Sequence, residues 1–319
     1  MREKSMATQK TLRKRETSER RRTDGVWNRM RKKKSCYLFL LPFFTLFLLF
    51  TVAPVLMAMG LSFTYYNVLE TPQFIGVQNY LQMLFYDDLF PTALSNTMTM
   101  AIFIGPIGYL TALLVAWMIN ELAPALRTIL VILFYAPSIS GNAYLIWTLL
   151  FSGDAYGYLN AWLMNWNLIG EPIQWLTDTQ YMMVCVIIVS LWMSLGTGFL
   201  SFVAGLQGID RSLYESAAID GVHNRWQELW YVTLPSMKPQ LLFGAVLSIT
   251  GAFSVGEICN NLCGNPSTDY AVHTLVNHMQ DYGNTRYEMG YACAISTFLF
   301  VLMMVSNQLI NRLLRKVGD

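Results

Sequence analysis

The side chains able to do chemistry are few and scattered in this 319-residue sequence. His223, His273 and His278 fall in predicted loops without partners at metal-ligand spacing, so we expect them to be solvated or to cap local structure. Cys259 and Cys263 stand four residues apart, but no histidine or second cysteine pair joins them, which favours free thiols in or near helices. The sequence shows no nucleophile paired with a base, and we expect neither catalysis nor a metal site in this chain.

A second set of polar residues lies within or beside long apolar stretches, where polar side chains are costly and often functional. They could line the path of a polar solute. The alternative is structural, because Ser and Thr in apolar helices commonly bond the backbone or join helices, and Trp192 suits packing as well as stacking. The candidates are Asn142, Tyr144, Trp192, Ser194, Thr197, Ser248, Thr250, Glu257, Asn260 and Asn261.

The most informative pattern is a polar segment at residues 210–239. Residues 214–219 favour a helix, and Asp220-Gly221 is a strong turn signal because Gly accepts positive φ. After the turn, four apolar residues recur at helical spacing, which predicts an amphipathic helix with one apolar face. They are Trp226, Leu229, Trp230 and Leu234, and Pro235 follows them. Such a helical hairpin needs a partner for its apolar face: lipid, the rest of the protein or another protein.

The elements that position these residues are apolar helices. The chain is 54% hydrophobic and 13% charged, whereas a soluble domain carries about a quarter charged residues. A helix needs about 20 mostly apolar residues to cross a bilayer, and six stretches meet that requirement. They are roughly residues 38–64, 97–119, 128–150, 181–205, 240–260 and 290–311. The sequence therefore predicts an all-α integral membrane protein with six transmembrane helices.

The distribution of charge orients this bundle. Residues 1–34 hold 14 of the 22 Lys and Arg, and with the N-terminus in the cytoplasm only Arg286 falls outside. This agrees with the positive-inside rule and predicts that both termini are cytoplasmic. We expect the basic tail, residues 1–34, to be disordered and attracted to anionic lipid head groups. A nucleic-acid role is disfavoured, because the apolar run that starts at Tyr37 makes the tail a topology signal.

The 210–239 segment resembles the EAA loop of binding-protein-dependent ABC importer permeases, whose pattern is roughly E-A-A-x-x-D-G-A-x(5)-F-x-x-I-x-x-P. This chain has one residue more than that pattern between its Gly and its final Pro, which leaves open whether Leu229 or Trp230 takes the Phe position. The residues that match the pattern are Glu215, Ala217, Asp220, Gly221 and Pro235.

Shorter matches in the same order are similar to permeases of the carbohydrate-uptake type, such as those for maltose or multiple sugars. The resemblance implies a MetI-like permease core at residues 74–316, preceded by a first transmembrane helix and the start of an external loop at residues 35–73. It also implies a bacterial cytoplasmic membrane location. The matches include Phe74-Ile75-Gly76, Asn79-Tyr80, Asn96-Thr97, Arg127-Thr128, Pro137, Gly264-Asn265-Pro266 and Gly290-Tyr291-Ala292.

The resemblance further implies how such a chain works. The 210–239 segment would dock on a cytoplasmic ABC ATPase dimer, with Glu215 as a polar contact, Asp220 as a cap and Gly221 as the turn. Trp226, Leu229 and Trp230 would fill an apolar pocket of that ATPase. ATP and Mg would bind there, because this chain lacks a G-x-x-x-x-G-K-[ST] phosphate loop and is expected to hold no cofactor. A second permease subunit and an extracellular solute-binding lipoprotein would complete an importer for a mono- or oligosaccharide.

Three alternatives stay open on the sequence alone. A permease of the same class could carry a non-sugar solute. A transporter or channel that works without ATP would need intramembrane ionisable residues or repeated broken helices, and the second to fourth stretches have almost no such residues. A membrane scaffold would leave the Glu215–Pro235 pattern unexplained.

Overall fold

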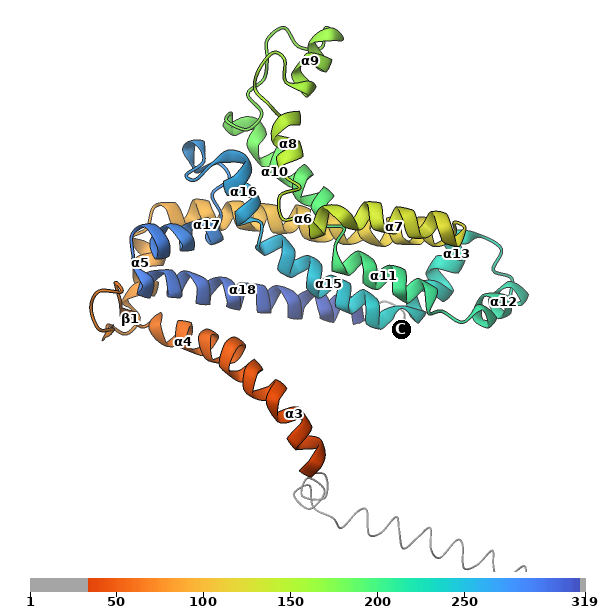
Figure 1. Ribbon diagram of the computed structural model, residues 1–319, viewed down its shortest axis with the longest axis horizontal. Helices are drawn as coiled ribbons and strands as arrows, with labels where there is room; N and C mark the ends of the chain where they lie inside the picture. The colour runs from red at the N-terminus through yellow and green to blue at the C-terminus, as the bar shows by residue number, and fades with distance from the viewer. Residues whose placement is uncertain (1–33, 316–319) are drawn as a thin grey trace, which may run out of the picture. The chain divides into compact units, whose positions relative to one another are not determined.

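The computed structural model describes residues 34–315, which are mostly helical (Figure 1). The described strands are two short ones, β1 (Thr64–Tyr65) and β2 (Gln73–Phe74), which form an antiparallel hairpin. Since every other described element is a helix, the all-α class is confirmed. The described chain divides into two compact units after Met57. The basic tail predicted to be disordered lies outside the described residues, apart from its last residue.

The helices follow one another with short connections, and several are interrupted by single turns of π- or 3-10 helix. In chain order they are α3 (Lys34–Phe47), η1 (Leu48–Val52), α4 (Ala53–Leu61), α5 (Gln78–Phe85), α6 (Leu89–Asn120), α7 (Pro124–Ile139), α8 (Leu145–Leu150), α9 (Tyr158–Asn165), α10 (Thr179–Met193), α11 (Thr197–Gln207), α12 (Arg211–Ile219), α13 (Arg225–Glu228), η2 (Leu229–Thr233), α14 (Leu234–Ser236), α15 (Lys238–Phe253), α16 (Gly256–Cys263), η3 (Thr268–Tyr270), α17 (Leu275–Gln280), η4 (Asp281–Thr285) and α18 (Met289–Arg315).

Four helical stretches among the described residues are long and apolar enough to cross a membrane. A fifth qualifies if α15 and α16, which meet at a 42° bend, form one span. These stretches correspond to five of the six predicted spans. The four that qualify without a bend of more than 40° are Tyr37–Leu61, Leu89–Asn120, Thr179–Gln207 and Met289–Leu314.

The predicted span at residues 128–150 differs in the structure. It consists of α7, with 16 residues, and α8, with six, separated by a turn. At 1.5 Å per residue, α7 is about 24 Å long, shorter than the roughly 30 Å of hydrocarbon. Helix α7 ends two residues after Pro137, which lacks an N–H and favours such an end. The described chain therefore does not confirm six spans.

Helix α6 is longer than the predicted stretch that began at residue 97. It starts at Leu89 because the Asp87 carboxylate accepts hydrogen bonds from the backbone N–H groups of Leu89 and Phe90, at 3.0 and 3.2 Å. Such side-chain acceptors satisfy N–H groups that a helix start leaves unpaired. The resulting 32-residue helix is about 48 Å long.

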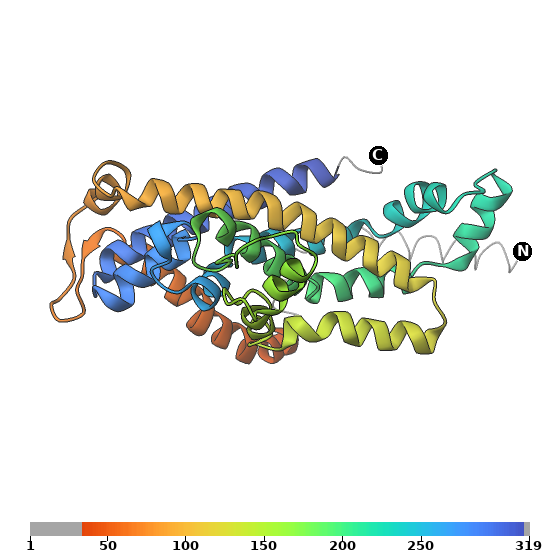
Figure 2. The same cartoon turned by 90° about the horizontal axis from the view of Figure 1, so that it is seen from above.

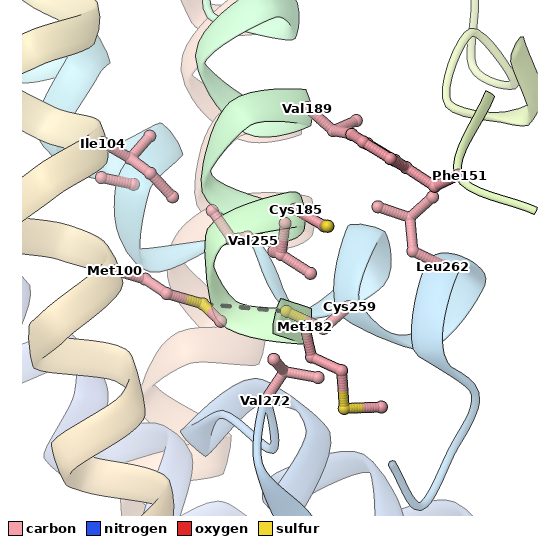
Figure 3. Close-up of a cluster of buried hydrophobic side chains, with 12 residues drawn as sticks. Met100, Ile104, Phe151, Met182, Cys185, Val189, Val255, Cys259, Leu262 and Val272 are labelled. Atoms are coloured by element: carbon pink, nitrogen blue, oxygen red, sulfur yellow. Dashed lines mark hydrogen bonds between the residues drawn. The ribbon is translucent and has the colours of Figure 1, made fainter. Parts of the chain in front are cut away.

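Helices α6, α11, α15 and α18 pack against one another and form the bundle of the unit 58–319. The β-hairpin and α5 lie at one end of this bundle, and α12 and α13 extend beyond the other end (Figures 1 and 2). Helices α8 and α9 project sideways from it (Figure 1). Buried side chains of α6, α10 and α16 fill one of its cores, in which the Cys259 thiol lies 3.8 Å from the Met100 sulfur (Figure 3).

Two residues of the short sequence matches, Asn79 and Gly290, have structural roles at the β-hairpin end. Asn79 is buried and donates to the carbonyl oxygens of Ser62 and Thr64, at 2.8 and 3.0 Å, which fixes the start of the hairpin on α5. Gly290 donates its N–H to the Tyr66 carbonyl at 3.1 Å, and a Cβ there would lie 2.1 Å from the Thr64 oxygen. Only glycine allows the hairpin to lie so close to α18.

Candidate functional site

Two of the apolar helical stretches are broken. The helix that spans residues 179–207 is interrupted at Ser194–Gly196, between α10 and α11, and the bent pair α15 and α16 is interrupted at Ser254 and Val255. Irregular backbone at membrane depth is tolerated where it is buried in protein or lines a cavity, since lipid cannot satisfy its polar groups. The two breaks therefore indicate a cavity between them.

A cavity of about 340 Å³ lies at these breaks. Helix α6 contributes Ile104, Gly108 and Ala112 to its wall, and both interrupted helices contribute their break residues. Among the described residues that line it, none is charged. Six carry a hydroxyl group, and these are Ser138, Ser190, Ser194, Thr197, Ser248 and Ser254.

The hydroxyl groups in this wall differ in how they are satisfied. Those of Ser138, Ser194 and Ser254 donate to backbone carbonyl oxygens three or four residues earlier, at 2.6–2.9 Å. Ser190 is buried, with 4% of its surface exposed, and its hydroxyl has no hydrogen-bond partner among the described residues. A buried, unpaired donor is costly, and a polar solute in the cavity would satisfy it.

The cavity contains three of the ten predicted solute-path residues: Ser194, Thr197 and Ser248. It also contains Ser138, Ser190 and Ser254, which the sequence did not lead us to predict. Ser190 and Ser194 are four residues apart, and that spacing places both on one helix face, so the sequence did carry a signal for Ser190.

The other seven predicted solute-path residues do not line this cavity. Tyr144 donates to Asn142 at 3.1 Å in the turn before α8, and Trp192 packs edge-to-face on Trp147 with ring centroids 5.6 Å apart. The Thr250 hydroxyl donates to the Val246 carbonyl at 2.9 Å, as the structural alternative predicted. Asn260 bonds with side chains of the segment that follows α16, namely Asn277 and Gln280. Glu257 and Asn261 are exposed.

The 210–239 segment forms the predicted helical hairpin at the end of the bundle (Figure 2). Gly221 has a φ of +93°, a conformation that side chains with a Cβ rarely adopt. The N–H of Gly221 bonds the Ala218 carbonyl and the N–H of Val222 bonds that of Ala217, so the turn closes α12 with a Schellman motif. Asp220, predicted to cap the turn or the following segment, is the C-cap residue of α12, whereas the N-cap of α13 is Asn224, whose side chain accepts from the Trp226 N–H.

The second helix of this hairpin does not present one apolar face. Leu229 and Val232 are buried in the protein, at 7 and 9% exposure, whereas Trp226 and Trp230 are 61 and 65% exposed. The change arises because residues 229–233 form a π-helical turn, which rotates the side chains away from 3.6-residue spacing. Leu229, Val232 and Pro235 therefore match F-x-x-I-x-x-P, and the extra residue lies before Leu229, on the turn side.

The remaining motif residues of the hairpin are accessible. Glu215, Asp220, Gly221 and Pro235 are exposed, and Ala217 is half-buried. With the two tryptophans they give the 210–239 segment a polar and aromatic surface, while the buried Leu229 cannot take part in an outside contact. The Tyr214 and Thr233 hydroxyls bond each other at 3.0 Å and join the two arms of the hairpin.

A buried polar cluster lies where the segment after α16 meets the starts of α6 and α18. The Asp87 carboxylate accepts from Tyr291 Oη at 2.6 Å and contacts His278 Nε2 at 2.8 Å, and His278 Nδ1 lies 3.3 Å from His273 Nε2. Both histidines are buried, at 4 and 0% exposure. The prediction that they are solvated is wrong, because Asp87 is far away in sequence and only the fold brings it to them; His223 alone is exposed.

Acid is expected to destabilise this cluster through His273. Burial and, next, the nearby His278 lower the pKa of His273 from 6.5 to about 4, while Asp281 and Asp87 oppose the shift and Arg286 adds to it. The unfolded chain then binds its proton first as the pH falls, so stability drops between pH 6.5 and 4, by about 2 kcal/mol at pH 5.

We therefore expect thermal unfolding in detergent to show a smaller pH 7.5-to-5.0 loss for His273→Gln than for the parent. The exposed His223→Gln should retain the parent's loss and is the control. Equal losses in all three proteins would contradict the role of His273. Asp87 does not contribute in this window: burial opposes its ionisation, but bonds from Tyr291 and His278 hold the pKa below 3.8, so its stabilising effect is lost only at lower pH.

Broken membrane helices around an uncharged cavity that carries several hydroxyl groups are typical of one class, the multi-pass α-helical membrane transport proteins. Residues 104–319 match a family described as "Binding-protein-dependent transport system inner membrane component". The chain is 31% identical to the probable ABC transporter permease protein YesP of Bacillus subtilis over 84% of this chain and 86% of that protein. It is 32% identical to the lactose transport system permease protein LacF of Rhizobium radiobacter, over 85% and 90%.

The fold is similar to that of a chain in the crystal structure of a bacterial ABC transporter involved in the import of the acidic polysaccharide alginate. The TM-score is 0.71 at 24% identity, with 92% of this chain and 99% of that chain covered. This likeness supports the permease fold alone.

The chain belongs to the family of inner membrane components of binding-protein-dependent transport systems, the permease subunits of ABC transporters. It is accordingly a multi-pass protein of the cytoplasmic membrane, and its relatives are transporter components rather than enzymes. This assignment disfavours the alternatives of a membrane scaffold and of a transporter that works without ATP.

Proposed function

We propose that this permease carries an uncharged carbohydrate, a mono- or oligosaccharide, through the cavity at the two helix breaks. The observation that carries the proposal is that six hydroxyl-bearing side chains stand in an otherwise apolar wall, with no charged residue among the described lining residues. Hydroxyl groups both donate and accept, as sugar hydroxyls do. An acidic sugar would leave its carboxylate without a counter-charge in this wall, which is costly away from water.

Relatives with sugar names support the same substrate class. Besides the lactose permease, the chain is 29% identical to the arabinooligosaccharides transport system permease protein AraP of Bacillus subtilis. It is 28% identical to the trehalose/maltose transport system permease protein MalF of Thermococcus litoralis. A non-sugar solute of similar polarity remains the second candidate, because hydroxyl groups bond any neutral polar molecule.

We also propose six membrane spans with both termini in the cytoplasm, α7 and α8 together supplying the third span. Three arginines support this orientation, since Arg127, Arg211 and Arg225 line one polar hollow beside the 210–239 segment. Arg286 stands instead near the start of α18, next to Asp281 at 2.7 Å. The clustering of basic residues at one end is the asymmetry that the positive-inside rule describes.

At that cytoplasmic end, the exposed side chains of the 210–239 segment would dock on an ABC ATPase dimer. Trp226 and Trp230 are the aromatic anchors and Glu215 the polar contact. ATP and Mg would be bound by the ATPase. A second permease subunit would complete the pathway, and an extracellular solute-binding lipoprotein would deliver the sugar. A binding protein does accompany one structural neighbour, an alginate transporter in complex with an alginate pentasaccharide-bound periplasmic protein.

Ser190→Ala tests the cavity. If the Ser190 hydroxyl bonds the solute, its removal costs one hydrogen bond and raises the half-saturation concentration of uptake by about 2- to 12-fold. It leaves thermal stability unchanged or higher, because the hydroxyl is unpaired in the protein. Uptake of radiolabelled lactose, maltose and arabinotriose by cells that express the whole importer measures the effect, with an oligouronate as the acidic comparison.

Thr250→Ala is the matched control, since the Thr250 hydroxyl already bonds the backbone and does not line the cavity. It should transport like the parent. Uptake of the oligouronate alone would refute the uncharged substrate class, and unchanged uptake by Ser190→Ala would remove Ser190 from the path.

A further inference from the structure

Helix α6 lines the cavity and also touches the second arm of the 210–239 segment through side chains near its C-terminal end; α15, which begins at Lys238 within that segment, also lines the cavity. Ile104, Gly108 and Ala112 stand in the cavity wall. Further along the same helix, Trp117 and the C-cap residue Glu121 reach the hairpin, between about one and five turns from the cavity residues. Because a continuous helix of this length is stiff, a displacement of the end of α6 that contacts the hairpin also displaces the part of α6 that lines the cavity.

Two contacts join the end of α6 to α13. The Trp117 and Trp226 rings lie 5.1 Å apart between centroids, tilted by 48°. The Glu121 carboxylate forms an ion pair with the Arg225 guanidinium. Trp226 and Arg225 are neighbours on the hairpin, and Trp117 and Glu121 are four residues apart on α6, so both contacts lie on one helix face. We name this four-residue set the α6 clip.

The α6 clip is poorly suited to holding the fold together. The Glu121 and Arg225 side chains are 35 and 63% exposed, and exposed ion pairs add little to stability. Trp226 is also largely exposed. The hydrogen bond between Tyr214 and Thr233 already closes the hairpin on itself. Together with the buried Leu229 and Val232, the contacts with α6 set where the hairpin lies relative to the bundle.

We propose that Trp117 and Glu121 are positioning residues that transmit movement of the 210–239 segment to the cavity wall through α6. The inference rests on the proposed function, in which an ATPase pushes that segment. Without the clip, the hairpin would still bind the ATPase through its outer surface, but its displacement would no longer be delivered to α6. ATP hydrolysis would then continue while the α6 wall of the cavity no longer follows the hairpin, which uncouples hydrolysis from the full opening and closing of the cavity.

The test uses the complex purified from native membranes through a tag on this chain. A Ser248→Cys reporter in the cavity is labelled with a maleimide, in a background whose native cysteines are serine, before and after trapping with ATP and vanadate. In the parent complex, trapping should change the labelling rate several-fold. Trp117→Ala and Glu121→Arg should lose this change while keeping the co-purified ATPase and its basal ATP hydrolysis.

Rescue separates positioning from damage to the fold. Trp117→Phe should retain the response, and Glu121→Arg combined with Arg225→Glu should regain it. Trp162→Ala is the matched control, because Trp162 of α9 packs against Trp166, away from the hairpin. A parent-like response in both Trp117→Ala and Glu121→Arg, or failure of the charge exchange, would overturn the clip. A parent complex without any ATPase would instead refute the proposed function, and the clip with it.

Discussion

Gly221→Pro is expected to abolish co-purification of the ATPase with this permease while leaving its membrane insertion intact. Proline fixes φ near −65°, whereas Gly221 stands at +93°. The substitution also removes the N–H that bonds the Ala218 carbonyl at 3.3 Å. The turn would then open. The second arm of the hairpin, with Trp226 and Trp230, would change its direction relative to α12.

The measurement is the amount of ATPase recovered with the tagged permease from solubilised membranes, against the permease content of those membranes. We expect a loss of at least about tenfold, since a misplaced proline costs about 3 kcal/mol or more. Gly221→Ala should give an intermediate loss, because alanine tolerates positive φ at a cost of about 1–2 kcal/mol. Gly170→Pro, in an exposed loop without positive φ, is the control. Parent-like recovery with Gly221→Pro would exclude the docking role.

Asp87→Ala is expected to cost about 3–5 kcal/mol of stability, the largest effect of any single substitution proposed for this chain. The Asp87 side chain is 5% exposed and His278 1%. Alanine would leave His278, the Tyr291 hydroxyl and the N–H groups of Leu89 and Phe90 without their acceptor. Buried groups stripped of a partner bear the full cost of their desolvation.

Thermal unfolding of the purified permease in detergent measures this effect. The neighbouring Asp88→Ala is the matched control, because Asp88 is exposed. Asp87→Ala combined with His278→Leu should recover part of the loss, since the second substitution removes an unpaired polar group. An Asp87→Ala protein as stable as Asp88→Ala would show that the cluster does not stabilise the fold.

The 210–239 segment shows where local sequence suffices. Asp220-Gly221 predicts the turn because the requirement is local: a positive φ that glycine alone meets without strain. The amphipathic face after the turn was predicted wrongly, because the periodicity assumed an α-helix throughout. The π-helical turn at residues 229–233 is selected by packing, since it buries Leu229 and Val232 in the protein and turns Trp230 outward.

The membrane helices divide in the same way. Long apolar stretches specify membrane crossing by themselves, because insertion of a stretch into the bilayer depends on its own length and hydropathy. Where a stretch breaks depends on its neighbours. The interruption at Ser194–Gly196 is tolerated beside a cavity, and the early start of α6 depends on Asp87 as an acceptor. Neither condition can be read from the stretch itself.

The sequence by itself determined the membrane class, most of the helical stretches, the hairpin turn at Gly221 and, through the order of its motifs, the family. Each of these depends on short-range chemistry: hydropathy over one helix length or the conformational freedom of one residue. Only the tertiary structure decided which polar residues meet. Asp87 and His278 are 191 residues apart, and Glu121 and Arg225 are 104 apart. Nothing within either local segment specifies its partner, because such pairs form only when packing of the whole bundle brings their helices together.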